Sequence, residues 1–158
     1  MKIPQKVIRF LSQNKVNYEI INHRTVYTAY DKAATLKVRL NMIGKTLIVK
    51  TDGDLTIILI PGNKNLDKNK FKKLAKIKKL DFISEKLMKN KFKGVKIGAI
   101  PPFGSLWRLP TFIDKSLINS PKIIINSGDY NFSIKLKGAA LKKLIPSLVI
   151  GNFTKVRK

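Results

Sequence analysis

Apolar and polar positions recur along the chain with two different periods, which indicates a domain that mixes helices and strands. Apolar residues at helical spacing after Pro4 predict a first helix over Pro4 to Asn14. Tyr18 to Ile21 has the pattern of a strand that leads to His23. Thr28 is a typical N-cap residue, and we expect the helix that follows it to run to about Val38.

The middle of the chain contains the clearest local signal. Lys45 to Thr51 and Leu55 to Ile60 are two runs rich in β-branched residues, joined through Asp52-Gly53. That dipeptide between two such runs is typical of a tight β-hairpin. Pro61-Gly62 then ends the second strand.

The second half of the chain alternates shorter elements. Asp67 is expected to cap a lysine-rich helix, and Ser84 to begin another. Val95 to Ile100 is a candidate strand that runs into the stiff loop Pro101 to Gly104. Later strands are expected at Phe112–Ile113, Lys122–Ile125, Phe132–Leu136 and Ser147–Ile150, with a last helix over Lys137–Leu144. Together these elements predict one α+β domain over residues 1–158 with a largely antiparallel sheet, followed from about residue 152 by a basic tail.

Charge is the dominant compositional feature. The chain has 33 Lys and Arg against 9 Asp and Glu, a formal charge of +24, while 44% hydrophobic residues suffice for a folded core. The segment Lys64 to Lys96 alone holds 13 lysines and three acidic residues. Such a field favours a nucleic acid or another phosphate-rich partner. Biased codon usage is the simpler alternative, and a membrane surface is a weaker one because no strongly amphipathic segment carries aromatics.

Several classes of protein are excluded by what the sequence lacks. It has no cysteine and one histidine, His23, so disulfides, thiolate catalysis and a multi-histidine metal centre are excluded. No apolar run reaches the length of a membrane-spanning helix, and the N-terminal residues do not resemble a secretory signal. The sequence also has no glycine-rich phosphate-binding motif. We therefore expect no metal, no cofactor and no membrane partner.

Few residues are candidates for chemistry. His23 is more simply a structural hydrogen-bonding residue than a base, because no nucleophile accompanies it in the sequence. Lys45 begins an apolar strand directly after Gly44, where its ammonium could bind a phosphate, although a solvated strand-end lysine is the simpler interpretation. The loop Gly98 to Gly104 has two prolines between glycines, a composition suited to a rigid pocket that presents backbone N–H groups.

These landmarks occur in an order that resembles one known family. The resemblance covers residues 5–150 and rests on ordered segments: His23 with Val26–Ala29, Gly44–Leu47, Pro61-Gly62, Leu66-Asp67, Gly98–Gly104, Leu109–Asp114 and Asn126–Gly128. On these segments the chain resembles the YbaK and prolyl-tRNA synthetase-associated editing-domain superfamily, whose members are aminoacyl-tRNA deacylases.

The resemblance implies a fold, a reaction and a site. The fold is a curved, barrel-like mixed sheet surrounded by helices, and the reaction is hydrolysis of the ester between a wrong amino acid and tRNA, most often tRNA(Pro). The catalytic role falls on Lys45, which would hold the phosphate next to the terminal adenosine. No protein nucleophile or metal is implied; a ribose hydroxyl of the tRNA or the substrate's own side chain assists. The substrate-binding residues implied are Gly98, Ala99, Ile100, Pro101, Pro102, Phe103, His23, Thr28, Ser127 and Gly128.

The partner implied is aminoacylated tRNA, with an aminoacyl-tRNA synthetase as an open further partner and a cytoplasmic location. The tRNA-binding candidates are Lys72, Lys73, Lys76 and Lys79. The turn Ser127 to Asn131 lacks the histidine of the alanine-specific branch, while Leu109 to Asp114 is closer to the free-standing YbaK branch. The amino acid removed therefore stays open among Cys, Ala, Ser and others. The alternative functions are a non-catalytic tRNA- or synthetase-binding module and a small-molecule esterase.

Overall fold

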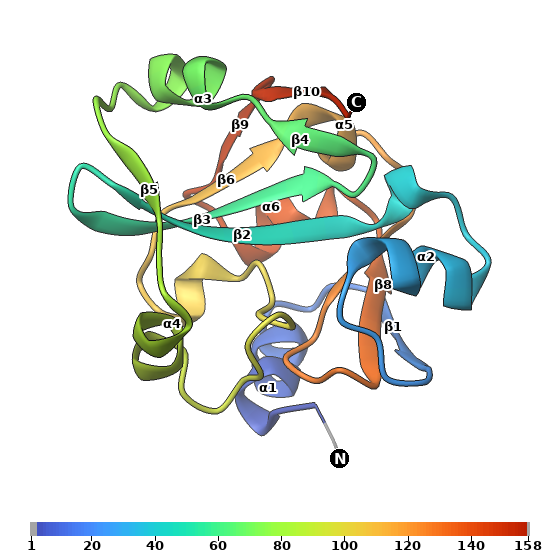
Figure 1. Ribbon diagram of the computed structural model, residues 1–158. Coiled ribbons are helices and arrows are strands. Elements are labelled where there is room, and N and C mark those ends of the chain that lie inside the picture. Colours follow the sequence, from blue (N-terminus) through green and yellow to red (C-terminus); the bar gives the residue numbers. More distant parts are fainter. Residues whose placement is uncertain (1–2, 158) are drawn as a thin grey trace.

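Strand β3 (Asp54–Pro61) lies at the centre of the molecule, because its residues 57–60 are all buried and contact three different groups of core side chains. The computed structural model describes residues 3–157 (Figure 1). Within them the helices are α1 (Gln5–Gln13), α2 (Ala29–Leu36), α3 (Lys68–Ala75), α4 (Glu85–Lys91), α5 (Lys115–Ile118) and α6 (Ala140–Leu144). Two short 3₁₀ turns are η1 (Leu40–Met42) and η2 (Gly104–Leu106). The other strands are β1 (Tyr18–Asn22), β2 (Gly44–Thr51), β4 (Lys64–Leu66), β5 (Leu80–Phe82), β6 (Thr111–Asp114), β7 (Ile123–Asn126), β8 (Phe132–Leu136), β9 (Val149–Gly151) and β10 (Thr154–Val156).

The strands form three sheets within the described residues. The largest has the order β5-β2-β3-β6-β9, in which β6 runs parallel to β3 and β9 parallel to β6. A second sheet, β1-β8-β7, and the pair β4-β10 are antiparallel. This arrangement confirms the predicted α+β class with largely antiparallel pairing. The described sheets do not close into a barrel, although β2 comes close to β7 through a bridge between Ile43 and Ile124.

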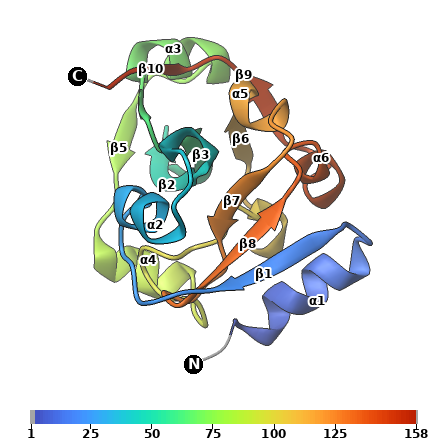
Figure 2. The ribbon, with the colours of Figure 1, turned by 90° about the vertical axis from the view of Figure 1, so that its right-hand side faces the viewer.

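Helices and loops cover both faces of the large sheet. Val7 and Leu11 of α1 pack with β7 and β8 and with Leu59 of β3, and Figure 2 shows α1 beside this three-stranded sheet. Phe71 of α3 packs with Ile58 and Ile60 on the other face of β3. Alternate residues of β3 therefore enter different cores, which explains why its hydrophobic run is nearly continuous.

The predicted hairpin is confirmed, and its turn has a clear physical cause. Asp52 and Gly53 have φ of 47° and 99°, the left-handed conformation that a two-residue hairpin turn requires. The Asp52 carboxylate accepts hydrogen bonds from the backbone N–H groups of Lys78 and Lys79, at 3.1 and 2.7 Å from one oxygen. These bonds hold the pKa of Asp52 below its usual value and tie the turn to the segment before β5.

Three N-caps are also confirmed. The side chains of Thr28, Asp67 and Ser84 accept hydrogen bonds from the backbone of the first turns of α2, α3 and α4. Helix α2 ends at Leu36, earlier than the expected Val38, and α3 ends at Ala75, because Lys37 and Lys76 adopt the left-handed conformation that ends a helix.

One strand prediction was wrong. Residues 95–100 form turns, and Gly98 has a φ of 88° that is incompatible with a strand. The backbone instead folds against a second loop: Lys96 N–H donates to Gly128 O at 3.0 Å, and Gly128 N–H donates to Ala99 O at 2.7 Å. An apolar run of six residues does not distinguish a strand from a buried loop.

Two features at the C-terminal end also differ from expectation. The last helix, α6, begins only at Ala140, after a turn at Lys137 to Ala139. Residues 152–157, expected to form a basic tail, pack against the rest of the domain. Phe153 is buried among the side chains around α3, and β10 pairs with β4. The basic end of the chain is therefore held in one position, which decides where Arg157 lies.

Candidate active site

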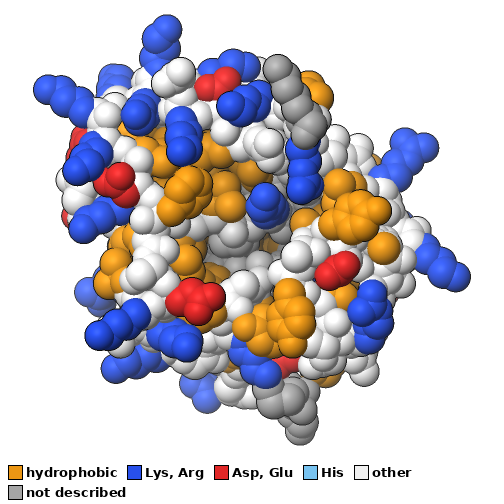
Figure 3. All heavy atoms as spheres, viewed as in Figure 1, with side chains coloured by type: hydrophobic (Ala, Val, Ile, Leu, Met, Phe, Trp, Pro, Cys, Tyr) orange, Lys and Arg blue, Asp and Glu red, His pale blue; other side chains and the backbone are white. Residues whose placement is uncertain are grey.

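A cavity of about 320 Å³ opens between α2, the start of β2, the Gly98 loop (residues 96–100), the turn after β7 and Arg157, which directly follows β10. Figure 3 shows a hollow in the middle of this face of the molecule, with hydrophobic and basic side chains around it. The volume lies within the range of small-molecule sites. Of the residues predicted for the site, four line this cavity: Lys45, Gly98, Ala99 and Thr28.

Lys45 is the second residue of β2, and its side chain lines the cavity. Its neighbour Gly44 is buried, and a Cβ atom there would lie 3.0 Å from Cγ2 of Ile125, so glycine allows β2 to cross β7 closely. The Lys45 side chain is half-buried, and no carboxylate of residues 3–157 forms an ion pair with its ammonium. Burial, and secondly the charge of Arg157, lowers the pKa of Lys45. The site therefore holds a cation that lacks a counterion among the described side chains.

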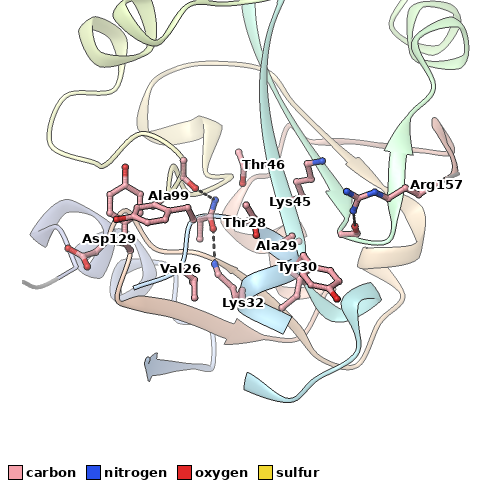
Figure 4. A pocket seen from close by; sticks show the side chains of 17 residues that line it. Val26, Thr28, Ala29, Tyr30, Lys32, Lys45, Thr46, Ala99, Asp129 and Arg157 are labelled. Atoms are coloured by element: carbon pink, nitrogen blue, oxygen red, sulfur yellow. Dashed lines mark hydrogen bonds between the residues drawn. The ribbon is translucent and has the colours of Figure 1, made fainter. Parts of the chain in front are cut away.

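Arg157 supplies a second cation on the same side of the cavity. Its Nη1 donates a hydrogen bond to the carbonyl oxygen of Gly62 at 3.4 Å. Arg157 directly follows β10, which pairs with β4. Figure 4 shows Arg157 and Lys45 on one side of the cavity and Ala99, Val26 and Asp129 toward the other. Two cations that converge on a concave surface form a site for an anion such as phosphate.

The Gly98 loop forms the other side of the cavity. Gly98 and Ala99 line it, while the following residues turn inward: Ile100 and Phe103 are almost fully buried and belong to two core groups. Pro101 and Pro102 are buried as well. Residues 100–103 thus lie behind the cavity wall and do not line it.

Ser127 and Gly128 also lie behind the wall. Ser127 is fully buried, and its hydroxyl donates to the carbonyl oxygen of Phe132 at 2.6 Å. Gly128 has a φ of 101° and bonds to Ala99 and Lys96 of the Gly98 loop. Both residues support the loop. Thr28 lines the cavity and caps α2 through its hydroxyl.

His23 lies outside the set of residues that line the cavity. Its Nε2 is 2.8 Å from Oγ of Ser133, and its Nδ1 is 2.7 Å from the carbonyl oxygen of Arg24. Partial burial lowers the pKa of His23. The pair with Ser133 has the spacing of a nucleophile and its base, but Ser133 is fully buried in β8 and does not line the cavity.

The four lysines predicted to bind tRNA lie on and after α3, away from the cavity wall. Lys73, Lys76 and Lys79 are exposed and Lys72 is half-buried. Lys79 forms an ion pair of 3.9 Å with Asp81 at the surface. Figure 1 shows α3 at one edge of the molecule, and these four lysines are the basic surface of that edge.

Sequence reasoning did not assign several of the residues that line the cavity to the site, among them Lys32, Thr46 and Arg157. Lys32 of α2 is 7% exposed and donates a hydrogen bond of 2.8 Å to Oδ1 of Asn126. Thr46 of β2 has a buried Oγ1 without a hydrogen-bond partner in the described part of the chain. Lys32 lies three residues after Ala29 and four before Leu36, both of which pack against the core, so a lysine on the apolar face of a capped helix was the available signal.

Within residues 3–157, no three His, Cys, Asp or Glu side chains come together as metal ligands. No helix there is long and apolar enough to cross a membrane.

The chain belongs to the aminoacyl-tRNA editing domain family, whose model matches residues 23–144. The segments that carry the sequence resemblance, from His23 to Gly128, all lie within that range. This protein is therefore an aminoacyl-tRNA deacylase, which is a hydrolase.

Relatives cover almost the whole chain. The "Prolyl-tRNA editing protein ProX" of Acetoanaerobium sticklandii is 26% identical over 151 residues, 92% of each chain. The "Putative Cys-tRNA(Pro)/Cys-tRNA(Cys) deacylase EbsC" of Enterococcus faecalis is 28% identical over 155 residues, 94% of this chain and 90% of its own. The crystal structure of "a putative trans-editing enzyme for prolyl tRNA synthetase" has a TM-score of 0.82 at 18% identity, covering 95% of this chain and 96% of its own. That structural likeness shows the fold.

Proposed function

We propose that this deacylase acts in trans on tRNA(Pro) that carries a wrong small amino acid such as Cys, Ala or Ser. The observation that carries the proposal is the cavity with Lys45 and Arg157 on one side and the Gly98 loop on the other. The names of the two relatives, prolyl-tRNA editing and Cys-tRNA(Pro) deacylation, support the choice of tRNA.

In this proposal the two cations bind the phosphate next to the terminal adenosine. A half-buried ammonium without a counterion gains from pairing with an anion, and Arg157 adds a planar donor group. Tyr27 and Tyr30, which are 66% and 67% exposed at the cavity, offer aromatic faces on which the adenine base can stack.

The aminoacyl group then lies against Gly98, Ala99 and Thr46. The buried, unpartnered hydroxyl of Thr46 is a donor for a substrate oxygen. Hydrolysis breaks the bond between the acyl carbon and the ribose oxygen; water supplies the oxygen of the released carboxylate, and the ribose oxygen regains a proton. A ribose hydroxyl of the tRNA assists the attack, and the protein contributes position and electrostatic stabilisation.

The test is a deacylation panel of tRNA(Pro) charged with Cys, Ala, Ser or Pro. We expect at least one wrong amino acid to be removed and Pro to be retained. Lys45→Ala should reduce the rate by about 100-fold, the effect of removing one strong electrostatic interaction. The matched control is Lys50→Ala, an exposed lysine on the same strand.

Two results would contradict the proposal. Removal of Pro as fast as of the other amino acids would exclude an editing role. Salt-sensitive tRNA binding with no turnover on any substrate would instead favour a module that binds tRNA or a synthetase.

A further inference from the structure

Lys32 is the one lysine of residues 3–157 whose side chain is buried, and it lines the cavity. It lies on α2, four residues after the N-cap Thr28, and its burial lowers its pKa to about 8. A buried ammonium is costly unless its N–H groups are hydrogen-bonded. Packing alone therefore does not account for a buried lysine beside the cavity, and a role in binding the substrate would.

The hydrogen bonding of Lys32 leaves two of its three N–H groups without a partner. Its Nζ donates to Oδ1 of Asn126 at 2.8 Å, and among the described residues no other acceptor bonds to it. Asn126 is itself held by the Gly98 loop, since its Nδ2 donates to the carbonyl oxygens of Ile100 at 3.2 Å and Gly98 at 3.5 Å. The amide thus fixes the ammonium, and the remaining donors can bind a ligand.

The position of Lys32 in the cavity indicates which part of a bound substrate it would contact. In Figure 4 its side chain lies between the cation side, with Lys45 and Arg157, and the side that carries Ala99 and Val26. Its hydrogen bond points toward Asn126 and the Gly98 loop. A substrate whose phosphate binds to Lys45 would bring its aminoacyl end to Lys32.

We propose that Lys32, oriented by Asn126, is a specificity-determining residue that favours an amino acid whose side chain carries a hydrogen-bond acceptor, such as the hydroxyl of serine. The inference rests on the proposed function, which places the aminoacyl group at this end of the cavity. A hydroxyl would accept a charge-assisted hydrogen bond from the ammonium, whereas a methyl side chain would leave its donors unsatisfied. A cationic side chain at this position would be repelled.

The experiment compares one tRNA(Pro), chemically charged with Ser or with Ala, as substrate for the wild type and for Lys32→Met. Methionine keeps the length of the side chain and removes its charge. We expect the wild type to deacylate Ser-tRNA(Pro) about tenfold faster than Ala-tRNA(Pro), which corresponds to the free energy of one charged hydrogen bond. Lys32→Met should lower the ratio of the Ser rate to the Ala rate by about that factor, because any loss of support for the cavity affects both substrates alike.

Controls separate specificity from structural support. Asn126→Ala removes both the bonds to the Gly98 loop and the partner that orients Lys32, so it should slow both substrates and also weaken the preference for Ser, while the exposed Lys50→Met should change neither rate. If Lys32→Met slows Ser and Ala equally, or if the wild type does not prefer Ser, the assignment of Lys32 is overturned.

A binding measurement keeps the inference testable without turnover. Adenosine 5′-phosphate carrying a 3′-seryl or 3′-alanyl group through a non-hydrolysable amide is titrated by calorimetry. The seryl compound should bind the wild type about tenfold more tightly, and Lys32→Met should remove that difference. Equal affinities in the wild type would overturn the inference. Absence of turnover together with a seryl preference in binding would contradict the proposed function alone.

Discussion

The ammonium of Lys32 lies 2.8 Å from Oδ1 of Asn126, a residue 94 positions later in the chain. This hydrogen bond joins α2 to the end of β7, and Asn126 continues the connection to the carbonyl oxygens of the Gly98 loop. Three segments that are distant in sequence are thus held around one cavity by a single lysine and a single amide. Substitutions of this lysine and of its neighbours should therefore affect stability and activity in separable ways.

Lys32 should make stability depend on pH in the alkaline range. Its pKa is about 8 in the folded protein and 10.5 in the unfolded chain, so between these values the unfolded chain binds more protons. Stability should therefore rise with pH across that window, by up to about 3 kcal/mol relative to Lys32→Met. Urea unfolding of both proteins from about pH 7 to 10.5 measures the difference. Parallel pH profiles for the two would show that Lys32 titrates as an ordinary lysine.

Thr46→Val should separate stability from activity. The substitution keeps the shape of the side chain and removes a buried hydroxyl that has no partner in the described structure. We expect the free energy of unfolding to stay constant or to rise by about 1 kcal/mol, while deacylation slows by about tenfold. Thermal unfolding and single-turnover rates check both parts. An unchanged rate would show that this hydroxyl does not touch the substrate.

Lys45 and Arg157 should act together on one phosphate. Arg157→Gln alone should weaken substrate binding by about tenfold. Because both cations would bind the same anion, the double variant with Lys45→Ala should lose less than the two single losses combined, with a coupling of about 1 kcal/mol. The exposed Lys155→Gln on β10 is the matched control. Simple additivity of the two losses would argue against a shared phosphate.

The basic surface of α3 should contribute to tRNA affinity and not to the chemical step. Lys73→Glu combined with Lys76→Glu should weaken tRNA binding and reduce its dependence on salt, by about 0.7 to 0.9 in the log–log slope for each phosphate that is no longer neutralised. Filter binding at several salt concentrations gives the slope. Lys137→Glu combined with Lys142→Glu, at two exposed positions outside α3, serves as the control for net charge. If the two changes leave the slope intact, this face points away from the RNA.

His23 should be replaceable without loss of the reaction. His23→Gln can retain a hydrogen bond to Ser133, and the histidine does not line the cavity. We expect the deacylation rate to stay within about threefold of wild type, with stability lowered by about 1 kcal/mol. A folded variant that loses activity, together with the pH dependence of a base, would assign His23 to catalysis.

Local signals in the sequence determined much of the fold. The Asp52-Gly53 turn, the N-caps at Thr28, Asp67 and Ser84, and the long apolar run of β3 each act through neighbouring residues, so their patterns predict the structure correctly. The strand expected at residues 95–100 failed because its backbone bonds to Gly128, more than 25 positions away. A local pattern contains no information about such a partner.

The same distinction holds for the site. The ordered motifs from His23 to Gly128, with those around Lys45 and Gly98 among them, carry the resemblance that predicted the family, and the family match confirms it. Only the tertiary structure brought Lys32, Asn126 and Arg157 to the cavity, and it turned Ile100 and Phe103 into the core. Whether a lysine lines a cavity depends on which distant helices and loops pack around it. That packing exists only in the assembled fold.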